Sequence, residues 1–125
     1  PLGKGFLTGT VDQSTSFADG DVRATIPRFT EENREANRAL VDHISAIAAS
    51  RGATSGQVAL AWLLAQHPWI VPIPGTRRTS RIEENAGSTA VALSADDLAD
   101  LDGLAQRVRV QGDRYNAQHM GYVGR

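Results

Sequence analysis

The sequence of 125 residues contains no cysteine, so it forms no disulfide and offers no thiolate ligand to a metal ion. It also lacks an apolar run near the roughly 20 residues that a membrane-spanning helix needs. Its first residues, PLGKGFLTG, do not show the apolar stretch typical of a signal peptide. The formal net charge of -1 gives no broad basic field for non-specific nucleic-acid binding. We therefore expect a cytoplasmic protein without membrane or nucleic-acid partners, in which any anion site is local.

Strand patterns are scarce as well. The apolar, β-branched run WIVPIPG (69–75) predicts one short buried strand that ends at Pro74 and Gly75, with Pro72 giving it an irregular end. One strand cannot form a sheet, and helices with broad apolar faces need a partner surface. Because Pro1 is not an initiator methionine and no strand precedes the glycine-rich opening, we expect a fragment of a longer protein. A processed N-terminus is the alternative.

Cap signals predict four helices. Thr30 is a candidate N-cap for a helix that ends at Gly52, and Glu31 and Glu32 suit the positive charge of its first turn. Two further helices begin with the capping-box pattern, at Thr54 with Gln57 and at Ser80 with Glu83, and residues Ser94 to Asp97 start a fourth helix. We expect Pro68 to end the second helix and the third to begin near Thr79 or Ser80.

Apolar residues recur three or four positions apart in these helices, which predicts one buried face on each. The expected core positions are Leu40, Val41, Ile44, Ile47 and Ala48, then Val58, Ala61, Leu64 and Ala65, then Leu98, Leu101, Leu104 and Val108. Residues 10–28 are polar and turn-rich and predict one long irregular loop, a kind of segment that is often functional. The tail after Val108 has no periodicity and predicts a C-terminal loop.

Three arginines, Arg77, Arg78 and Arg81, crowd the point where the predicted strand passes into a helix. A helix N-terminus already attracts anions, and the arginine fork matches phosphate oxygens in a bidentate manner. These arginines therefore predict a phosphate site, with PLGKG offering backbone amides and Lys4 to a second phosphate. The glycines match neither the G-x-G-x-x-G pattern nor a Walker A loop. The alternative is a solvated cluster in which Arg78 pairs with Glu83 or Glu84.

These stretches together resemble the aldo-keto reductase superfamily. PLGKGFLTG is similar to the segment that ends the seventh barrel strand, and VPIPGTRRTSRIEENAGS (71–88) to the eighth strand and the following cofactor-binding helix. GATSGQVALAWLLAQ (52–66) resembles the helix between them, and LSADDLADLDGLA (93–105) the helix after them. The resemblance covers essentially the whole chain in the expected order, and it is strongest to the branch that resembles pyridoxal reductases and general aldehyde reductases.

The resemblance implies an α/β fold, the C-terminal part of a (β/α)8 TIM barrel, mostly helical with one or two short strands. Residues 1–125 would form one fragment of a single barrel, with 10–29 as a long loop over the cofactor and 109–125 as the C-terminal loop. The rest of the barrel would be the missing N-terminal half. A closing loop of this kind can set the release rate of a cofactor, and a disordered surface loop is the alternative.

The family implies NADPH/NADP+ as cofactor and the reduction of aldehydes or ketones to alcohols by hydride transfer. By position, the pyrophosphate would lie along Leu2, Gly3 and Lys4, and the 2′-phosphate of the adenosine within a turn of Gly75, Thr76, Arg77 and Arg78. Arg81 would pair with that phosphate and stack on the adenine, whose edge would contact Glu84 and Asn85. Many relatives have a lysine in place of Gly75, so we expect Arg77 or Arg78 to replace its charge.

The catalytic tyrosine, aspartate, lysine and histidine of the family belong to the N-terminal half, and none maps onto this chain. We therefore assign no catalytic residue and no metal, and we expect the chain alone to be inactive toward a carbonyl substrate. Histidines His43 and His67 are predicted surface residues, while His119 and Tyr122 either touch substrate or belong to a solvated tail. A non-catalytic, regulatory relative that only binds NADPH is the alternative function.

Overall fold

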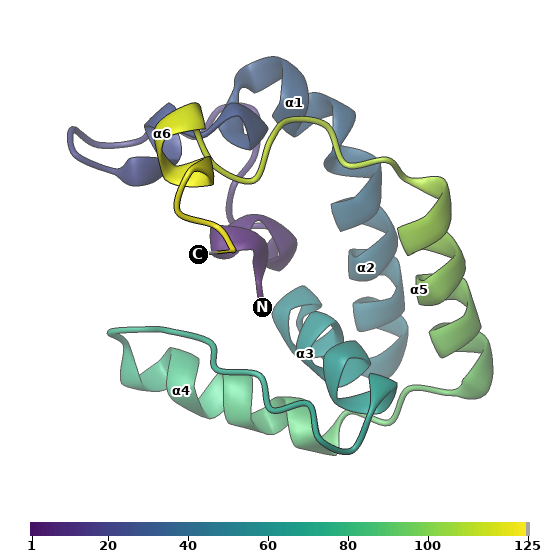
Figure 1. Cartoon of the computed structure of the whole chain (residues 1–125). Helices are drawn as coiled ribbons and strands as arrows, with labels where there is room; N and C mark the ends of the chain where they lie inside the picture. The colour runs from purple at the N-terminus through teal and green to yellow at the C-terminus, as the bar shows by residue number, and fades with distance from the viewer. Residues whose placement is uncertain (125) are drawn as a thin grey trace.

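The computed structural model describes residues 1–124, and their regular structure is entirely helical (Figure 1). The elements are η1 (Gly3–Thr8), η2 (Val22–Thr25), η3 (Pro27–Phe29), α1 (Glu31–Ala36), α2 (Arg38–Arg51), α3 (Ser55–Gln66), α4 (Thr79–Ala86), η4 (Gly87–Ala90), α5 (Ala95–Arg107) and α6 (Ala117–Met120), where η marks a 3-10 helix. No helix among these residues is long and apolar enough to cross a membrane. Residue 125, the last of the predicted 109–125 loop, lies outside the described residues.

Local cap chemistry sets most helix ends. The Thr54 hydroxyl accepts a hydrogen bond from the Gln57 amide, and the Gln57 side chain accepts one from the Thr54 amide. Ser94 and Asp97 form the same reciprocal box at the start of α5. Gly52 ends α2 in the left-handed region, with φ of 62°. These ends confirm the cap predictions, because each depends on residues no more than three positions apart.

One predicted helix is interrupted, and another has a different cap from the one predicted. The expected helix after Thr30 is interrupted at Asn37, whose side chain is 1% exposed and bonds the backbone of Gln111 instead. Helix α4 begins at Thr79, one of the two predicted starts, but the capping box at Ser80 is wrong, because Arg78 is the N-cap. The Thr76 hydroxyl accepts the Arg78 amide at 3.1 Å and so starts the turn earlier than the Ser80 pattern indicates.

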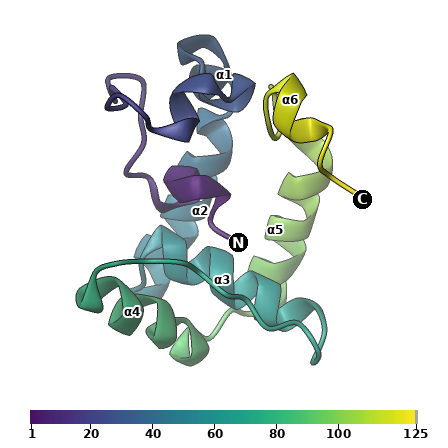
Figure 2. The ribbon, with the colours of Figure 1, turned by 60° about the vertical axis from the view of Figure 1, so that its left-hand side comes forward.

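The core lies where α2 and α5 run side by side and α3 crosses them (Figures 1 and 2). It is formed by Ile44, Ile47, Ala48, Val58, Leu101 and Leu104. The predicted faces of α2 and α5 are thus confirmed at their centres. On α3, Leu64 is exposed and Val58, Ala59, Leu60 and Ala61 are buried, so its burial is concentrated in the first two turns.

Residues 10–29 form a packed segment with two 3-10 helices. Val11, Ile26 and Phe29 are buried in a second apolar cluster with Phe6 and Val41. The ring of Phe29 meets that of Phe6 edge-on with centroids 6.3 Å apart. Burial of these side chains ties the segment to the N-terminal residues and to α2.

The expected buried strand at 69–75 is wrong for this chain. Residues 1–124 contain no strand, and Trp69, Val71 and Ile73 are 74%, 77% and 83% exposed. A strand is stabilised by backbone bonds to a neighbour and by burial of its faces, and the described residues supply neither here. The apolar side chains of Trp69, Val71 and Ile73 are therefore exposed on a segment that pairs with no strand among the described residues.

The tail after α5 runs back over the region of α1 and includes the short helix α6 (Figure 1). Arg28 Nε donates to the Gly112 carbonyl at 3.1 Å. Gly112 has φ of 83°, and a Cβ on it would come within 2.7 Å of the Arg28 backbone. The tail is thus docked rather than loose, although its sequence has no periodic pattern.

Candidate functional site

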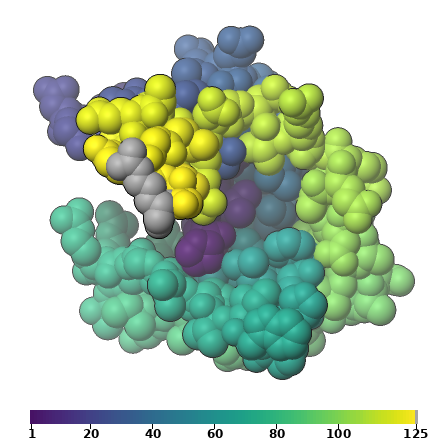
Figure 3. All heavy atoms as spheres, viewed as in Figure 1, coloured from purple at the N-terminus to yellow at the C-terminus, as the bar shows by residue number. Residues whose placement is uncertain are grey.

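A pocket of about 670 Å³ lies between the N-terminal segment and the start of α4. In the space-filling view, the hollow opens between the α4 segment and the tail, with the N-terminal residues behind it (Figure 3). Nine of the ten predicted site residues line the pocket: Leu2, Lys4, Gly75, Thr76, Arg77, Arg78, Arg81, Glu84 and Asn85. Gly3 does not line it. Segments more than 70 positions apart thus meet at one cavity.

The N-terminal wall turns sharply because three successive residues are left-handed. Gly3, Lys4 and Gly5 have φ of 60°, 56° and 94°, and Lys4 is the one residue other than glycine with positive φ in the described chain. The Leu2 carbonyl accepts the amides of Gly5 at 3.1 Å and Leu7 at 3.3 Å. The glycines are needed here, because side chains rarely adopt this region, and they allow the chain to curl around the pocket.

Positive charge dominates the pocket lining. Lys4, Arg23, Arg77, Arg78 and Arg81 contribute cations, whereas Glu84 is the one carboxylate that the described residues contribute to the lining. Arg81 Nη1 pairs with Glu84 Oε2 at 2.5 Å. Lys4, Arg77 and Arg78 have no ion pair within residues 1–124. The pocket therefore has three cations available to an anion.

Arg23 is compensated by a carboxylate beside the pocket. It pairs with Asp21 at 2.6 Å, and its Nη1 donates to the Lys4 carbonyl at 3.3 Å. Hydrogen bonds from the Arg23 side chain and amide lower the pKa of Asp21 to about 2. The pKa of Arg23 is raised by the same pair. This pair fastens the 10–29 segment to the left-handed turn, and it is fully charged at neutral pH.

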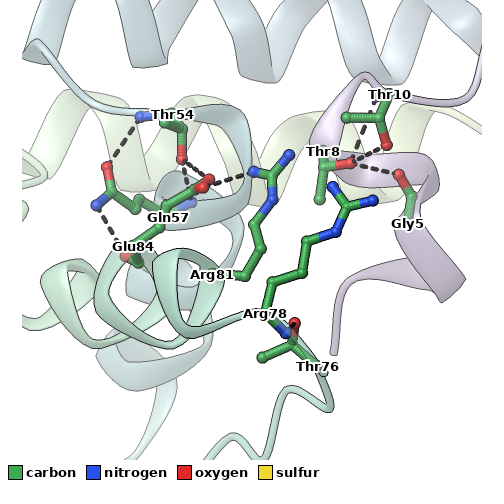
Figure 4. A network of polar contacts seen from close by, with 9 residues as sticks. All are labelled: Gly5, Thr8, Thr10, Thr54, Gln57, Thr76, Arg78, Arg81 and Glu84. Carbon is green, nitrogen blue, oxygen red and sulfur yellow. Dashed lines mark hydrogen bonds and ion pairs between the residues drawn. The ribbon is translucent and has the colours of Figure 1, made fainter.

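Arg78 and Arg81 reach from α4 toward the N-terminal segment (Figure 4). The Arg81 fork is oriented by Glu84, whose Oε1 also accepts the Thr54 hydroxyl at 2.9 Å. Gln57 Nε2 donates to the Glu84 carbonyl at 2.8 Å, which fixes the end of α4 against the start of α3. The alternative pairing of Arg78 with Glu83 or Glu84 does not occur in the described chain, so Arg78 keeps its whole guanidinium for the pocket.

Sequence reasoning missed four polar residues of the lining: Thr8, Thr10, Thr15 and Arg23. The Thr8 hydroxyl donates to the Gly5 carbonyl at 2.6 Å and lies 2.8 Å from the Thr10 hydroxyl (Figure 4). The one feature of the sequence that could have indicated Thr8 and Thr10 is that they lie on either side of Gly9. Arg23 and Thr15 carried no local signal, because the turns of the 10–29 segment bring them to the pocket.

Histidines lie away from this pocket. His43 Nε2 contacts Asp100 Oδ2 at 2.7 Å and links α2 to α5, while His67 stacks on Trp69 with centroids 4.6 Å apart. His119 Nδ1 contacts Asn116 Oδ1 at 2.8 Å within the tail. Within residues 1–124, no histidine or tyrosine lines the pocket. The described lining is therefore suited to binding and orienting an anion.

The chain is similar to known proteins over most of its length. The model of the aldo/keto reductase family matches residues 1–106. The chain is 44% identical over 115 residues to the aldo-keto reductase yakc of Schizosaccharomyces pombe, whose name specifies NADP(+). It is 39% identical over 114 residues to the aldo-keto reductase str7 of Strobilurus tenacellus. The aligned parts cover 92% and 91% of this chain but 34% of each relative, so the chain spans about a third of their length.

Proposed function

Because the chain belongs to the aldo/keto reductase family, we propose that it is the NADPH-binding part of an oxidoreductase that reduces aldehydes or ketones to alcohols. The observation that carries this proposal is that Lys4, Arg77 and Arg78 meet at one pocket and have no carboxylate partner among residues 1–124. Three uncompensated cations suit a ligand with several phosphate groups. The NADP(+) in the name of one relative supports the same cofactor class.

We assign the 2′-phosphate to the α4 end of the pocket. Arg78 caps α4 and Arg77 precedes it, so both cations stand where the free amides of the helix also attract an anion. Arg81 adds a fork whose Nη1 is held by Glu84, which leaves its other N–H groups for a phosphate oxygen. The pyrophosphate is assigned to Leu2 and Lys4 at the opposite wall. Glu84 and Asn85 are the assigned contacts of the adenine edge.

NADPH would supply the hydride when bound, and the residues of this chain would hold and orient it. The proton for the carbonyl oxygen needs a donor from outside the described lining, which contains no histidine or tyrosine. We therefore propose that the chain alone binds the cofactor and does not turn over a carbonyl substrate. Its contribution to catalysis would be placement of the cofactor, which converts an encounter of two molecules into an oriented reaction.

The exposed apolar segment supports a second part of the proposal. Val71, Ile73 and Ile82 are more than half exposed, and Val71 and Ile82 share an apolar groove of about 360 Å³ with Leu64. We propose that the remainder of a barrel covers this face, since the relatives are about three times as long as the aligned region. Light scattering should then show self-association of the chain alone, and a monodisperse monomer at high concentration would contradict this part.

The assignment of Arg81 is tested by comparing NADPH with NADH. Arg81→Ala should weaken NADPH binding by about 1–3 kcal/mol, the loss of a charge-assisted hydrogen bond, and leave NADH binding nearly unchanged. Titration calorimetry on the chain measures both. Because the substitution also frees Glu84, the double variant with Glu84→Gln separates lost attraction from new repulsion. Arg109→Ala, outside the pocket, is the control. Equal losses for the two cofactors would overturn the 2′-phosphate assignment.

A further inference from the structure

Lys4 stands between the pocket and the C-terminal tail. It lines the pocket, yet its Nζ lies 4.2 Å from the centroid of the Tyr115 ring. The same Nζ donates to the Arg114 carbonyl at 3.4 Å. Neither Arg114 nor Tyr115 lines the pocket itself. The ammonium group of one pocket residue is therefore held by two tail residues that would not touch a ligand there.

The tail reaches this position through anchors that do not involve Lys4. Asn37 Nδ2 donates to the Gln111 carbonyl at 2.9 Å, and the Gln111 amide donates to Asn37 Oδ1 at 2.8 Å. On the other side of Tyr115, Asn116 Nδ2 donates to the Thr25 hydroxyl at 3.1 Å. Tyr115 itself packs at the edge of the second apolar cluster. These contacts hold the Tyr115 ring in place without Lys4, so the ring can restrain the flexible Lys4 side chain.

The aromatic face, rather than the hydroxyl, makes the contact. An ammonium within about 6 Å of a ring centroid is attracted by the ring quadrupole. Arg114 offers a second cation to the same ring, but its Cζ is 5.9 Å from the centroid and Lys4 Nζ is nearer. No carboxylate pairs with Lys4 in residues 1–124. The ring face and one carbonyl are therefore the groups that restrain this ammonium.

We propose that Tyr115 is a positioning residue for the pocket: its ring holds the Lys4 ammonium in place and so lowers the entropy lost when Lys4 binds a phosphate. This inference rests on the proposed function. An unrestrained lysine gives up much rotamer freedom on contacting a ligand, and a side chain already ordered by a neighbour gives up less. The tail would thus strengthen cofactor binding without touching the cofactor.

The proposal is tested by NADPH affinity in a set of matched variants. Tyr115→Leu should weaken NADPH binding about two- to fivefold, the loss of a partly exposed cation–π contact. Tyr115→Phe, which keeps the ring, should restore the affinity of the original chain. Arg114→Gln keeps the backbone carbonyl and removes the second cation, so it should change nothing. In a Lys4→Met background, Tyr115→Leu should have no further effect.

A second readout needs no cofactor. Reductive methylation of Lys4, followed by mass spectrometry, should proceed faster in Tyr115→Leu than in Tyr115→Phe, with far-ultraviolet circular dichroism showing both folded. Equal methylation rates, or additive losses in the Lys4→Met background, would overturn the positioning role. If the original chain binds NADPH and the Tyr115→Leu variant binds it with the same affinity, the positioning role is overturned and the proposed function stands. Absence of NADPH binding by the original chain would overturn the proposed function and this inference with it.

Discussion

Two isoleucines represent two regions of this molecule. Ile44 is 5% exposed in the core between α2, α3 and α5, whereas Ile73 is 83% exposed in the extended segment that leads to the pocket. The first region is completed by residues of the described chain. The second presents apolar and charged groups whose partners are not among those residues. The contrast separates the region whose side chains are buried within the described chain from the region whose side chains are exposed to a ligand or to another part of a protein.

The sharpest test of this contrast is the same substitution at both isoleucines. Ile44→Ala should lower the free energy of unfolding by about 2–5 kcal/mol, because it removes buried methyl groups and leaves a cavity. Ile73→Ala should stay within about 0.5 kcal/mol, since its side chain contributes little to the fold of this chain. Urea denaturation followed by circular dichroism measures both. A large loss at Ile73 would show that the extended segment is packed in solution.

The core helices were predicted better from the sequence than the exposed segment. Thr54, Ser94 and Gly52 were predicted as helix ends because cap chemistry needs only neighbours within a few residues. The strand at 69–75 failed because a strand depends on a partner far away in the sequence. Local sequence patterns therefore predict helix caps, whose partners lie within a few residues. They do not predict a strand, whose partner lies far away in the sequence or outside the described residues.

The pocket was predicted by a different route. The residues themselves predicted a phosphate site at Arg77, Arg78 and Arg81, with Lys4 offered to a second phosphate and a solvated cluster as the alternative. The family resemblance then assigned both groups to one cofactor. Arg23 was missed because no local pattern brings it there; the turns of the 10–29 segment do. The docking of the tail was missed for the same reason, since the Asn37 contacts with Gln111 link positions 74 apart.

Two glycines sharpen the comparison within the loops. Gly112 and Gly20 both have φ of 83°, but a Cβ would meet the Arg28 backbone at 2.7 Å from Gly112 and nothing within 4 Å from Gly20. Gly20→Ala should lower the free energy of unfolding by about 1 kcal/mol, the cost of a left-handed side chain. Gly112→Ala should lose about 1–3 kcal/mol, because the clash is added to that backbone strain.

Thermal unfolding of the two glycine variants measures the difference directly. Limited proteolysis adds a local readout, because a displaced tail should be cut near Gly112 in Gly112→Ala and remain protected in Gly20→Ala. Equal stability losses with equal protection would mean that the tail does not dock on Arg28 in solution, and the Lys4 contact with Tyr115 would lose its support.

The smallest expected effect distinguishes a real cap from an apparent one. The Ser94 hydroxyl accepts the Asp97 amide at 3.1 Å, whereas Ser80 lies inside α4 and makes no cap hydrogen bond. Ser94→Ala should therefore lower the free energy of unfolding by about 1 kcal/mol, and Ser80→Ala should leave it unchanged or raise it slightly, since alanine is the better helix former. Urea titration of both variants decides this. A loss at Ser80 equal to that at Ser94 would mean that Ser80 is the N-cap and that α4 begins two residues later in solution, which would move Arg78 out of the cap position and weaken its assignment to the phosphate.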